Sequence, residues 1–337
     1  MKKFAILFAL LASVGLARAE VSMFGTMDVG FSDVKAPGST SSQTAFTSGG
    51  MTTSNIGFQG KENLGKGTSA VFELSSFVNA GNGALLGGST VNTFARSSFV
   101  GLSNNAMGTV TLGRQINPSF LPTVLFNAYG DSSAYSPLWH ATYFGRTGNP
   151  TTQIFNDTAW DNSVAFKSPT VGGATVTAMV SKGTGGNNSG VNVLYFKGDL
   201  GLTAYTQRTE VNSSGSFQNN IFTANKPATA TGFGASYDLK VAKVFATWQE
   251  GKDSSLNMDG KTTQVSALIP MGRGNVMAEY ATSRSVVGAT ATKYNEWALG
   301  YDYNLSKKAD LYVTAGRTSV THLADGSSVG AGLRLRF

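Results

Sequence analysis

Apolar and polar residues alternate along most of the chain after residue 19. The C-terminus shows this most clearly, because every second residue there is apolar: Ala331, Leu333, Leu335 and Phe337. The positions between them hold glycines and two arginines, Arg334 and Arg336. A period of two is typical of a β-strand with one apolar face. An arginine facing lipid costs about 2–4 kcal/mol, so Arg334 and Arg336 are predicted to face water.

The same pattern recurs in segments of about ten to fourteen residues, separated by breaks that are alternately short and long. The short breaks have turn chemistry, as in residues 63–67 and 197–199. The long breaks are polar and rich in glycine: about 34–52, 80–92, 183–189, 211–228, 252–259 and 321–327. About sixteen such segments predict an all-β fold: one domain, residues 20–337, forming a transmembrane antiparallel 16-stranded up-and-down β-barrel.

Residues 1–19 have a different character. Lys2 and Lys3 precede an apolar run that ends in Ala17-Arg18-Ala19, which is the pattern of a signal peptide cleaved before Glu20. The apolar run is shorter than the ~20 residues that a spanning helix needs. Residues 1–19 are therefore predicted to be removed on export.

One connection, about residues 117–160, differs from the others. It contains four prolines and several aromatic residues, and one part, about residues 122–129, is predicted to form a short helix. A long loop rich in aromatic residues is seldom a disordered tip, because its aromatic surface is best buried. The nearest place to bury it is the barrel lumen. The loop is therefore predicted to fold inward and narrow the pore.

Composition narrows the range of functions. The chain has no Cys, 41 Gly and 11% aromatic residues, which favours strands and turns and removes disulfides and thiolate metal sites. Three of the cations behind the net charge of +7 lie in the signal segment, and the rest are dispersed, so nucleic-acid binding is not predicted.

Catalytic chemistry has little support in the sequence. His140 and His322 are the only histidines, both fall in predicted loops, and neither has a nearby nucleophile motif. Contact of both rings with water is the simpler interpretation. We expect no enzyme activity, no resident metal and no cofactor.

Several stretches, taken in order, resemble the trimeric general porins of Gram-negative bacteria, in particular the beta-proteobacterial type. They read VSMFGTMD at 21–28, SNIGFQGKENLG at 54–65, RSSFVGLS at 96–103, GTVTLGRQ at 108–115 and DNSV at 161–164, with a final Phe337. The resemblance spans the whole chain after residue 19. It implies a homotrimer of 16-stranded barrels in the outer membrane, through which small hydrophilic solutes and ions diffuse passively. It also implies an inward third loop, and a role for Phe337 as the signal read by the outer-membrane assembly machinery.

Two positions depart from that family. Asn55 and Ala159 stand where many relatives carry an arginine, and Arg96 is the retained member of the arginine group that rings the constriction. The resemblance therefore does not imply strong anion selectivity for this chain.

Charges on a narrow wall bias which ions enter, because water screens them less there than on an open surface. The candidates for the pore constriction are Lys61, Arg96, Arg114 and Lys167, set against Glu62, Glu73, Asp131 and Asp157. Arg96 is the favoured one.

Three alternatives remain open at this point. A substrate-selective channel would hold a sugar or organic acid against the aromatic residues of the 117–160 loop. An outer-membrane enzyme such as a phospholipase would depend on His140 or His322. An adhesin or purely structural barrel would conduct no ions.

Overall fold

The structure is a computed structural model that describes residues 20–86, 93–143, 158–183, 186–210, 227–254 and 257–337. The predicted signal peptide and Asp157 lie outside the described residues. Almost all described residues outside 117–143 belong to strands or to the turns that join them.

The first nine strands are β1 (Glu20–Lys35), β2 (Gln43–Ser48), β3 (Asn55–Gly65), β4 (Thr68–Val78), β5 (Leu85–Leu86), β6 (Ser97–Asn104), β7 (Gly108–Ile116), β8 (Ala159–Lys167) and β9 (Ala174–Gly183). The remaining strands are β10 (Gly186–Lys197), β11 (Leu200–Thr209), β12 (Ala228–Asp238), β13 (Lys243–Asp253), β14 (Met258–Met271), β15 (Gly274–Val287), β16 (Thr290–Asn304), β17 (Ala309–Val320) and β18 (Gly326–Arg336). Two short helices, α2 (Phe120–Leu125) and α3 (Pro137–Thr142), lie between β7 and β8.

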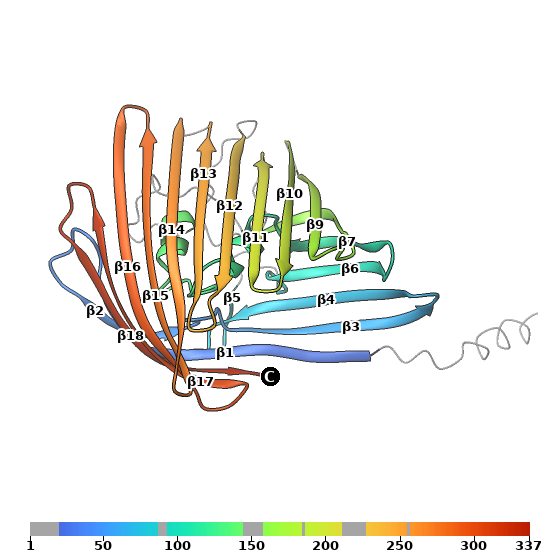
Figure 1. Ribbon diagram of the computed structural model, residues 1–337, viewed down its shortest axis with the longest axis horizontal. Helices are drawn as coiled ribbons and strands as arrows, with labels where there is room; N and C mark the ends of the chain where they lie inside the picture. The colour runs from blue at the N-terminus through green and yellow to red at the C-terminus, as the bar shows by residue number, and fades with distance from the viewer. Residues whose placement is uncertain (1–19, 87–92, 144–157, 184–185, 211–226, 255–256) are drawn as a thin grey trace, which may run out of the picture.

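The strands form one closed antiparallel sheet, in which neighbours around the ring follow one another in sequence and β1 pairs with β18 (Figure 1). The described strands fill sixteen positions in this ring, because two positions are each occupied by two strands. β2 and β3 pair in succession with the same edge of β1, and β5 and β6 do so with β4. The predicted 16-stranded barrel is confirmed.

Apolar residues occupy the outer face of this ring. On β6 and β7 the exposed positions are apolar, such as Val100, Leu102 and Leu112, whereas Gly101 and Thr111 between them are buried. Arg334 also follows the prediction, because it is 7% exposed and takes the inner face together with Asp310. A closed sheet satisfies its backbone groups internally, so an apolar outer face makes it compatible with lipid.

Turn lengths differ from the sequence expectation at one place. Residues 183–189 are not a long loop, since β9 and β10 remain paired as far as Gly183 and Gly186. The glycines in residues 183–189 suggested a loop. In a sheet, however, glycine also occurs where a large side chain packs over the strand. Gly330 of β18 is such a position, because a Cβ there would meet the ring of Tyr135.

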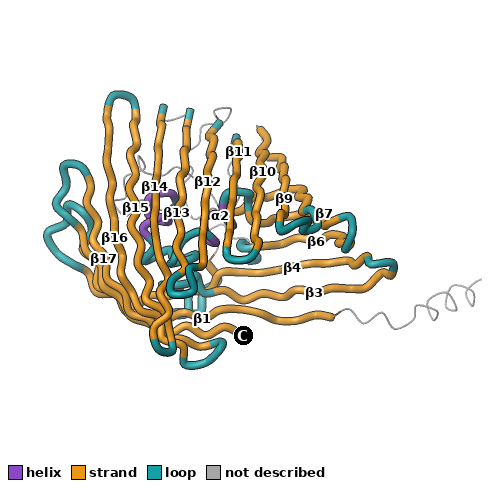
Figure 2. Tube along the Cα trace, viewed as in Figure 1, coloured by secondary structure: helices purple, strands orange, loops and turns teal. Residues whose placement is uncertain are grey.

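The segment between β7 and β8 contains the two helices (Figure 2). The predicted helix at about 122–129 starts earlier, at Phe120, and ends at Leu125. The second helix was not predicted. It begins at Pro137, and the Ser136 hydroxyl caps it by accepting a hydrogen bond from the Trp139 N–H. α3 contacts β14, β15 and β16, and α2 contacts β11.

Candidate functional site

The segment 117–143 is fixed to strands far away in sequence. The Ala128 N–H donates to Ser266 of β14 at 3.0 Å, and the hydroxyls of Tyr129 and Thr314 of β17 are 3.0 Å apart. Ser132 donates to the Gly50 carbonyl at 2.7 Å. Each of these bonds lies on the polar face of the ring and is buried from solvent, which gives it a role in holding the segment in one position.

Two buried carboxylates make the strongest of these attachments. Glu279 of β15 accepts hydrogen bonds from the Ser136 hydroxyl at 3.0 Å and from the Leu138 N–H at 2.8 Å. Glu296 of β16 lies 2.9 Å from Nδ1 of His140. A buried group left without such a hydrogen-bond partner costs about 1–3 kcal/mol.

The expectation that both histidines contact water is therefore wrong for His140. Its side chain is 2% exposed, and its second ring nitrogen lies 3.0 Å from the Ser133 carbonyl. Carboxylates on two distant strands create the buried environment of His140, so no motif near it in the sequence could predict that environment. His322 is exposed, as expected.

Aromatic residues complete the attachment. The ring of Phe120 packs edge-on against Trp139, with centroids 5.3 Å apart, and against Tyr143 at 6.0 Å. Trp139 and Tyr143 also pack with Tyr205 of β11. The aromatic residues of this segment, noted in the sequence, thus pack against one another and against Tyr205 of β11.

A second segment, between β2 and β3, is also attached to the strands by hydrogen bonds. The carboxylate of Asp28 accepts hydrogen bonds from the backbone N–H groups of Met51 and Thr52, at 2.8 and 2.7 Å. Tyr312 of β17 donates its hydroxyl to the same carboxylate at 2.7 Å. Asp28 therefore holds residues 51–52 against the wall where β1 and β18 close the ring.

Arg334 joins this region to a network of charges. Its guanidinium contacts Asp302 and Asp310 at 3.1 Å and donates to the Thr52 hydroxyl at 2.8 Å. Arg336 lies 2.6 Å from Asp310. The two arginines are thus neutralised by β16 and β17, which the sequence pattern did not identify.

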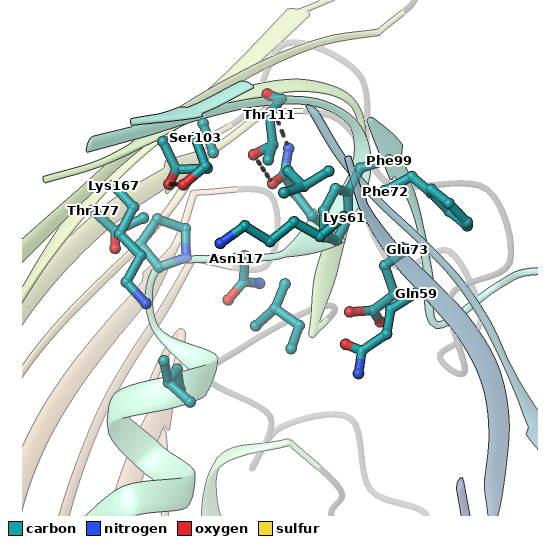
Figure 3. A pocket seen from close by; sticks show the side chains of 18 of the residues that line it. Gln59, Lys61, Phe72, Glu73, Phe99, Ser103, Thr111, Asn117, Lys167 and Thr177 are labelled. Carbon is teal, nitrogen blue, oxygen red and sulfur yellow. Dashed lines mark hydrogen bonds between the residues drawn. The ribbon is translucent and has the colours of Figure 1, made fainter. Parts of the chain in front are cut away.

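The opposite part of the inner wall borders a cavity of about 660 Å³. Figure 3 shows Lys61 of β3 and Lys167 of β8 pointing into it, with Gln59 and Glu73 side by side on the neighbouring strands. Apolar side chains line it as well, among them Phe99, Ile116 and Leu121. In the part of the chain that the structure describes, neither lysine has a carboxylate within 4.0 Å.

Arg96 precedes β6, and its side chain contacts the inner face of β4, where Glu73 also lines this cavity. Its guanidinium is 3.2 Å from Glu73 and 3.3 Å from the Ser75 hydroxyl. The structure thus brings together Arg96, Glu73, Lys61 and Lys167 from the predicted set. The Arg96 side chain is 28% exposed, so its charge remains accessible to ions.

Asp131, on the segment 117–143, faces the same charges. Burial raises the pKa of its carboxyl above the ordinary value of 3.8, and a hydrogen bond from Thr52 with the charges of Arg334 and Arg96 opposes part of that rise. Asp131 therefore places an acid on the segment within electrostatic range of Arg334 and Arg96.

Two of the predicted residues that the structure describes are not part of this arrangement. Glu62 alternates with Lys61 and takes the outer face, in register with Ala70. Arg114 is 8% exposed, binds Asp161 at 2.8 Å and borders a different hollow, lined also by the outward-facing Ser98. Its strand is bulged between Gly113 and Gln115, and this irregularity is what a simple alternation misses. Asp157 lies outside the described residues.

The two positions that depart from the resembled family are small and buried. Asn55 is 7% exposed and donates to the Thr53 carbonyl, and Ala159 is 2% exposed. Phe337 has its ring on the outer face, and its backbone pairs with Gly25 of β1.

Among the described residues, no group of His, Cys, Asp or Glu has the arrangement of a metal site. Nor does any helix in the described ranges have the length and apolar character needed to cross a bilayer.

Sequence comparisons find related proteins over nearly the whole length. A family model described as Gram-negative porin matches residues 5–323. An outer membrane porin protein of Bordetella pertussis is 26% identical over 406 residues, which cover 100% of both chains. Outer membrane porin protein 32 of Delftia acidovorans is 28% identical over 347 residues, covering 98% of this chain and 92% of the relative.

Structure comparisons find the same architecture. An anion-selective porin from Comamonas acidovorans superposes with a TM-score of 0.75 at 22% identity, covering 95% of this chain and 100% of that chain. The outer membrane protein OmpT of Vibrio cholerae, folded in vitro, gives a TM-score of 0.67 at 14% identity, covering 96% and 99%. At these identities the similarity concerns the fold.

Proposed function

Since the chain belongs to the Gram-negative porin family, we propose that its barrel is a passive, water-filled channel for small hydrophilic solutes and ions across the outer membrane. One observation carries this function: the ring is apolar outside and polar inside, and its inner wall borders a cavity of about 660 Å³. A polar lumen inside a closed sheet offers solutes a path that avoids the lipid.

The segment 117–143 is proposed to fold into this lumen and form its constriction. Its contacts with Ser266, Glu279, Glu296 and Thr314 support this, because these residues lie on the polar face of four successive strands. Arg96 and Glu73 on the wall, with Asp131 on the segment, are the charges proposed to set ion selectivity. Lys61 and Lys167 add positive charge to the wall of the cavity that Glu73 also lines.

Assembly into a homotrimer is proposed on the family resemblance. So are cleavage of residues 1–19 on export and recognition of Phe337 by the outer-membrane assembly machinery. The exposed ring of Phe337, which follows the C-terminal end of β18, is compatible with such recognition.

A channel without enzyme activity is proposed. His140 is the histidine nearest to the lumen, and both of its ring nitrogens are already within hydrogen-bond distance of protein oxygens. That arrangement supports an anchoring role for the ring in place of a catalytic one. A hydrolase test with phospholipid vesicles, in which the purified barrel releases fatty acid, would contradict the proposal.

The channel itself is tested by recording the purified protein in a planar bilayer under a salt gradient. We expect ohmic steps of conductance and a reversal potential that reports the balance of wall charges. A bilayer that shows no conductance after verified insertion would instead support an adhesin or a structural barrel. Block of the current by micromolar sugar or organic acid would support a substrate-selective channel.

A further inference from the structure

The imidazole of His140 is enclosed where α3 packs against β16. Its Nδ1 atom lies 3.0 and 2.9 Å from the two carboxylate oxygens of Glu296, and its Nε2 atom lies 3.0 Å from the Ser133 carbonyl oxygen. The side chains of His140 and Glu296 are only 2% and 1% exposed. Each nitrogen of the ring therefore faces an oxygen atom of the protein in a site closed to solvent.

Both of these oxygen groups accept hydrogen bonds and have none to donate. A backbone carbonyl carries no proton, and neither does an ionised carboxylate. A neutral imidazole has one N–H, so one of its nitrogens would face an oxygen lone pair at 3.0 Å without a proton between them. A doubly protonated ring donates from both nitrogens. The partners of His140 thus fit the imidazolium form.

The proton between Nδ1 and Glu296 belongs on the ring for two reasons. Tyr294 donates its hydroxyl to the Glu296 carboxylate, and a hydrogen bond donated to a carboxylate favours its ionised form. An ordinary imidazole also binds a proton about two pH units above an ordinary Glu carboxyl. His140 and Glu296 therefore form a buried ion pair, to which Tyr294 adds a third hydrogen bond.

The groups that surround this ion pair are acidic or uncharged. On β15, Glu279 lies within electrostatic range of Glu296 and has no Lys or Arg within 4.0 Å in the part of the chain that the structure describes. The hydroxyl of Tyr129, on the segment 117–143 itself, lies within range of both carboxylates. The buried residues at the same level on the flanking strands are uncharged: Gln264 and Ser266 on β14, and Thr318 on β17. These surroundings favour a positive charge on the ring.

We propose that His140 is held as an imidazolium at neutral pH and that this proton positions α3, so that its loss at alkaline pH releases α3 from β16. Without the proton, one nitrogen has no hydrogen to donate, and the ion pair with Glu296 is lost. A group that keeps its proton above its ordinary range when folded contributes stability that is present at low pH and lost as the pH rises.

The effect of this proton on the pore rests on the proposed constriction. If the segment 117–143 narrows the lumen, its release at alkaline pH should widen the lumen. The protonation of His140 and the attachment of α3 are separate from the channel function, and both are measured below without a bilayer.

The first measurement follows the ring nitrogens directly. The chain has two histidines, and His322→Asn leaves His140 as the remaining one. Asn tolerates the φ of 64° at that exposed position. The protein is folded in detergent micelles with ¹⁵N-labelled histidine, and the ring ¹⁵N shifts, which differ clearly between protonated and bare nitrogens, are recorded from pH 6 to 10. We expect both nitrogens to be protonated at pH 8, where an ordinary histidine, with a pKa of about 6.5, is almost entirely neutral.

Two variants make this titration specific. Glu296→Gln removes the carboxylate, so the ring should lose its second proton at least about one pH unit lower than in the parent. Glu250→Gln removes a carboxylate that pairs with Lys261 and should leave the titration unchanged. A bare ring nitrogen at pH 8 in the folded parent overturns the inference, and so does an equal titration in Glu296→Gln. If Glu296→Gln does not fold, the parent measurement decides alone.

The second measurement asks whether the proton positions α3. The chain has no Cys, so Thr142→Cys places a single thiol at a fully buried position at the end of α3. Its labelling rate is divided by that of Ser41→Cys, which is exposed, to correct for ionisation of the thiol. This ratio should rise at least about tenfold across the His140 titration, as expected for loss of one buried hydrogen bond to a charged group.

His140→Gln serves as the comparison, because its amide does not titrate. In that background the labelling ratio should be independent of pH. A ratio that stays constant in the parent, or that rises equally in His140→Gln, would show that the proton on His140 does not hold α3.

Discussion

The two sides of the inner wall are built differently. Strands β11 to β18 are covered by the segment 117–143 and by residues 51–52, and their charged groups are buried and paired. Strands β1, β3, β4 and β6 to β10 border the cavity, and Lys61 and Lys167 there lie open to it. On the side of β11 to β18, buried carboxylates hold chain segments in position by hydrogen bonds. On the side that borders the cavity, charged side chains remain accessible to solutes.

This difference separates the two roles that a charge can take in a lumen. A buried carboxylate such as Glu279 is valuable because its partners would be left without hydrogen bonds if it were removed. A half-exposed cation such as Arg96 makes weaker bonds but acts on passing ions through a partly desolvated space. Substitutions on the two sides should therefore have different effects.

The largest effect is expected on the covered side. Replacing Glu279 with Ala leaves the Ser136 hydroxyl and the Leu138 N–H without their acceptor, at a cost of about 1–3 kcal/mol for each buried donor. The segment should loosen from the wall, and single-channel conductance should rise and become noisier. Planar-bilayer recording measures this, with Glu62→Ala on the outer face as the matched control. Conductance equal to that of the parent would show that Glu279 does not hold the constriction.

The next effect concerns selectivity on the open side. Replacing Arg96 with Gln removes a positive charge but keeps a polar side chain near Glu73, so the anion-to-cation permeability ratio should fall by about twofold to fivefold. The reversal potential in a salt gradient reports this change. Arg114→Gln serves as the control, since Arg114 binds Asp161 away from the cavity, and a reversal potential unchanged in Arg96→Gln would refute its place at the constriction.

Asp131 should act in the opposite direction. Burial raises the pKa of Asp131 above 3.8, so its carboxyl takes up a proton at a higher pH than an ordinary Asp does. A raised pKa in the folded state means that the neutral form is favoured there, and the associated stability is lost as pH rises through that pKa. Lowering the pH from 7 toward 4 should therefore increase anion preference.

Asp131→Asn removes that titration. Its reversal potential at pH 7 should already be shifted toward anions, and its further shift on acidification should be smaller than that of the parent. An identical pH dependence in the two proteins would assign the titration to another group.

The smallest effect is expected from Lys61→Gln and Lys167→Gln, each less than about twofold in the permeability ratio. Both lysines border a cavity wide enough to hold water, where salt screens their charges over about 8–10 Å. Measuring the ratio at low and high salt distinguishes this from a direct contact. A change in either variant as large as that of Arg96→Gln would place the constriction at the cavity that the two lysines line.

The alternation of apolar and polar residues predicted most of the fold but only part of the candidate site. It placed Arg334 on the inner face, and it puts Lys61 and Glu62 on opposite faces of β3. Glu62 was nevertheless a candidate for the constriction, because it was chosen for its charge alone. It did not identify the bulge at Gly113, which interrupts the period next to Arg114. It also said nothing of the partners of Glu279 and Glu296, because these residues are more than 130 positions away from Ser136 and His140.

The sequence by itself determined that this chain forms a closed ring with an apolar outside, because a period of two fixes which face each side chain takes whatever its neighbours are. Only the tertiary structure decided which charges are buried as anchors and which stay open. Those contacts depend on where the segment 117–143 packs against the wall. They link residues that are far apart in the sequence at no regular spacing, so no periodic pattern predicts them.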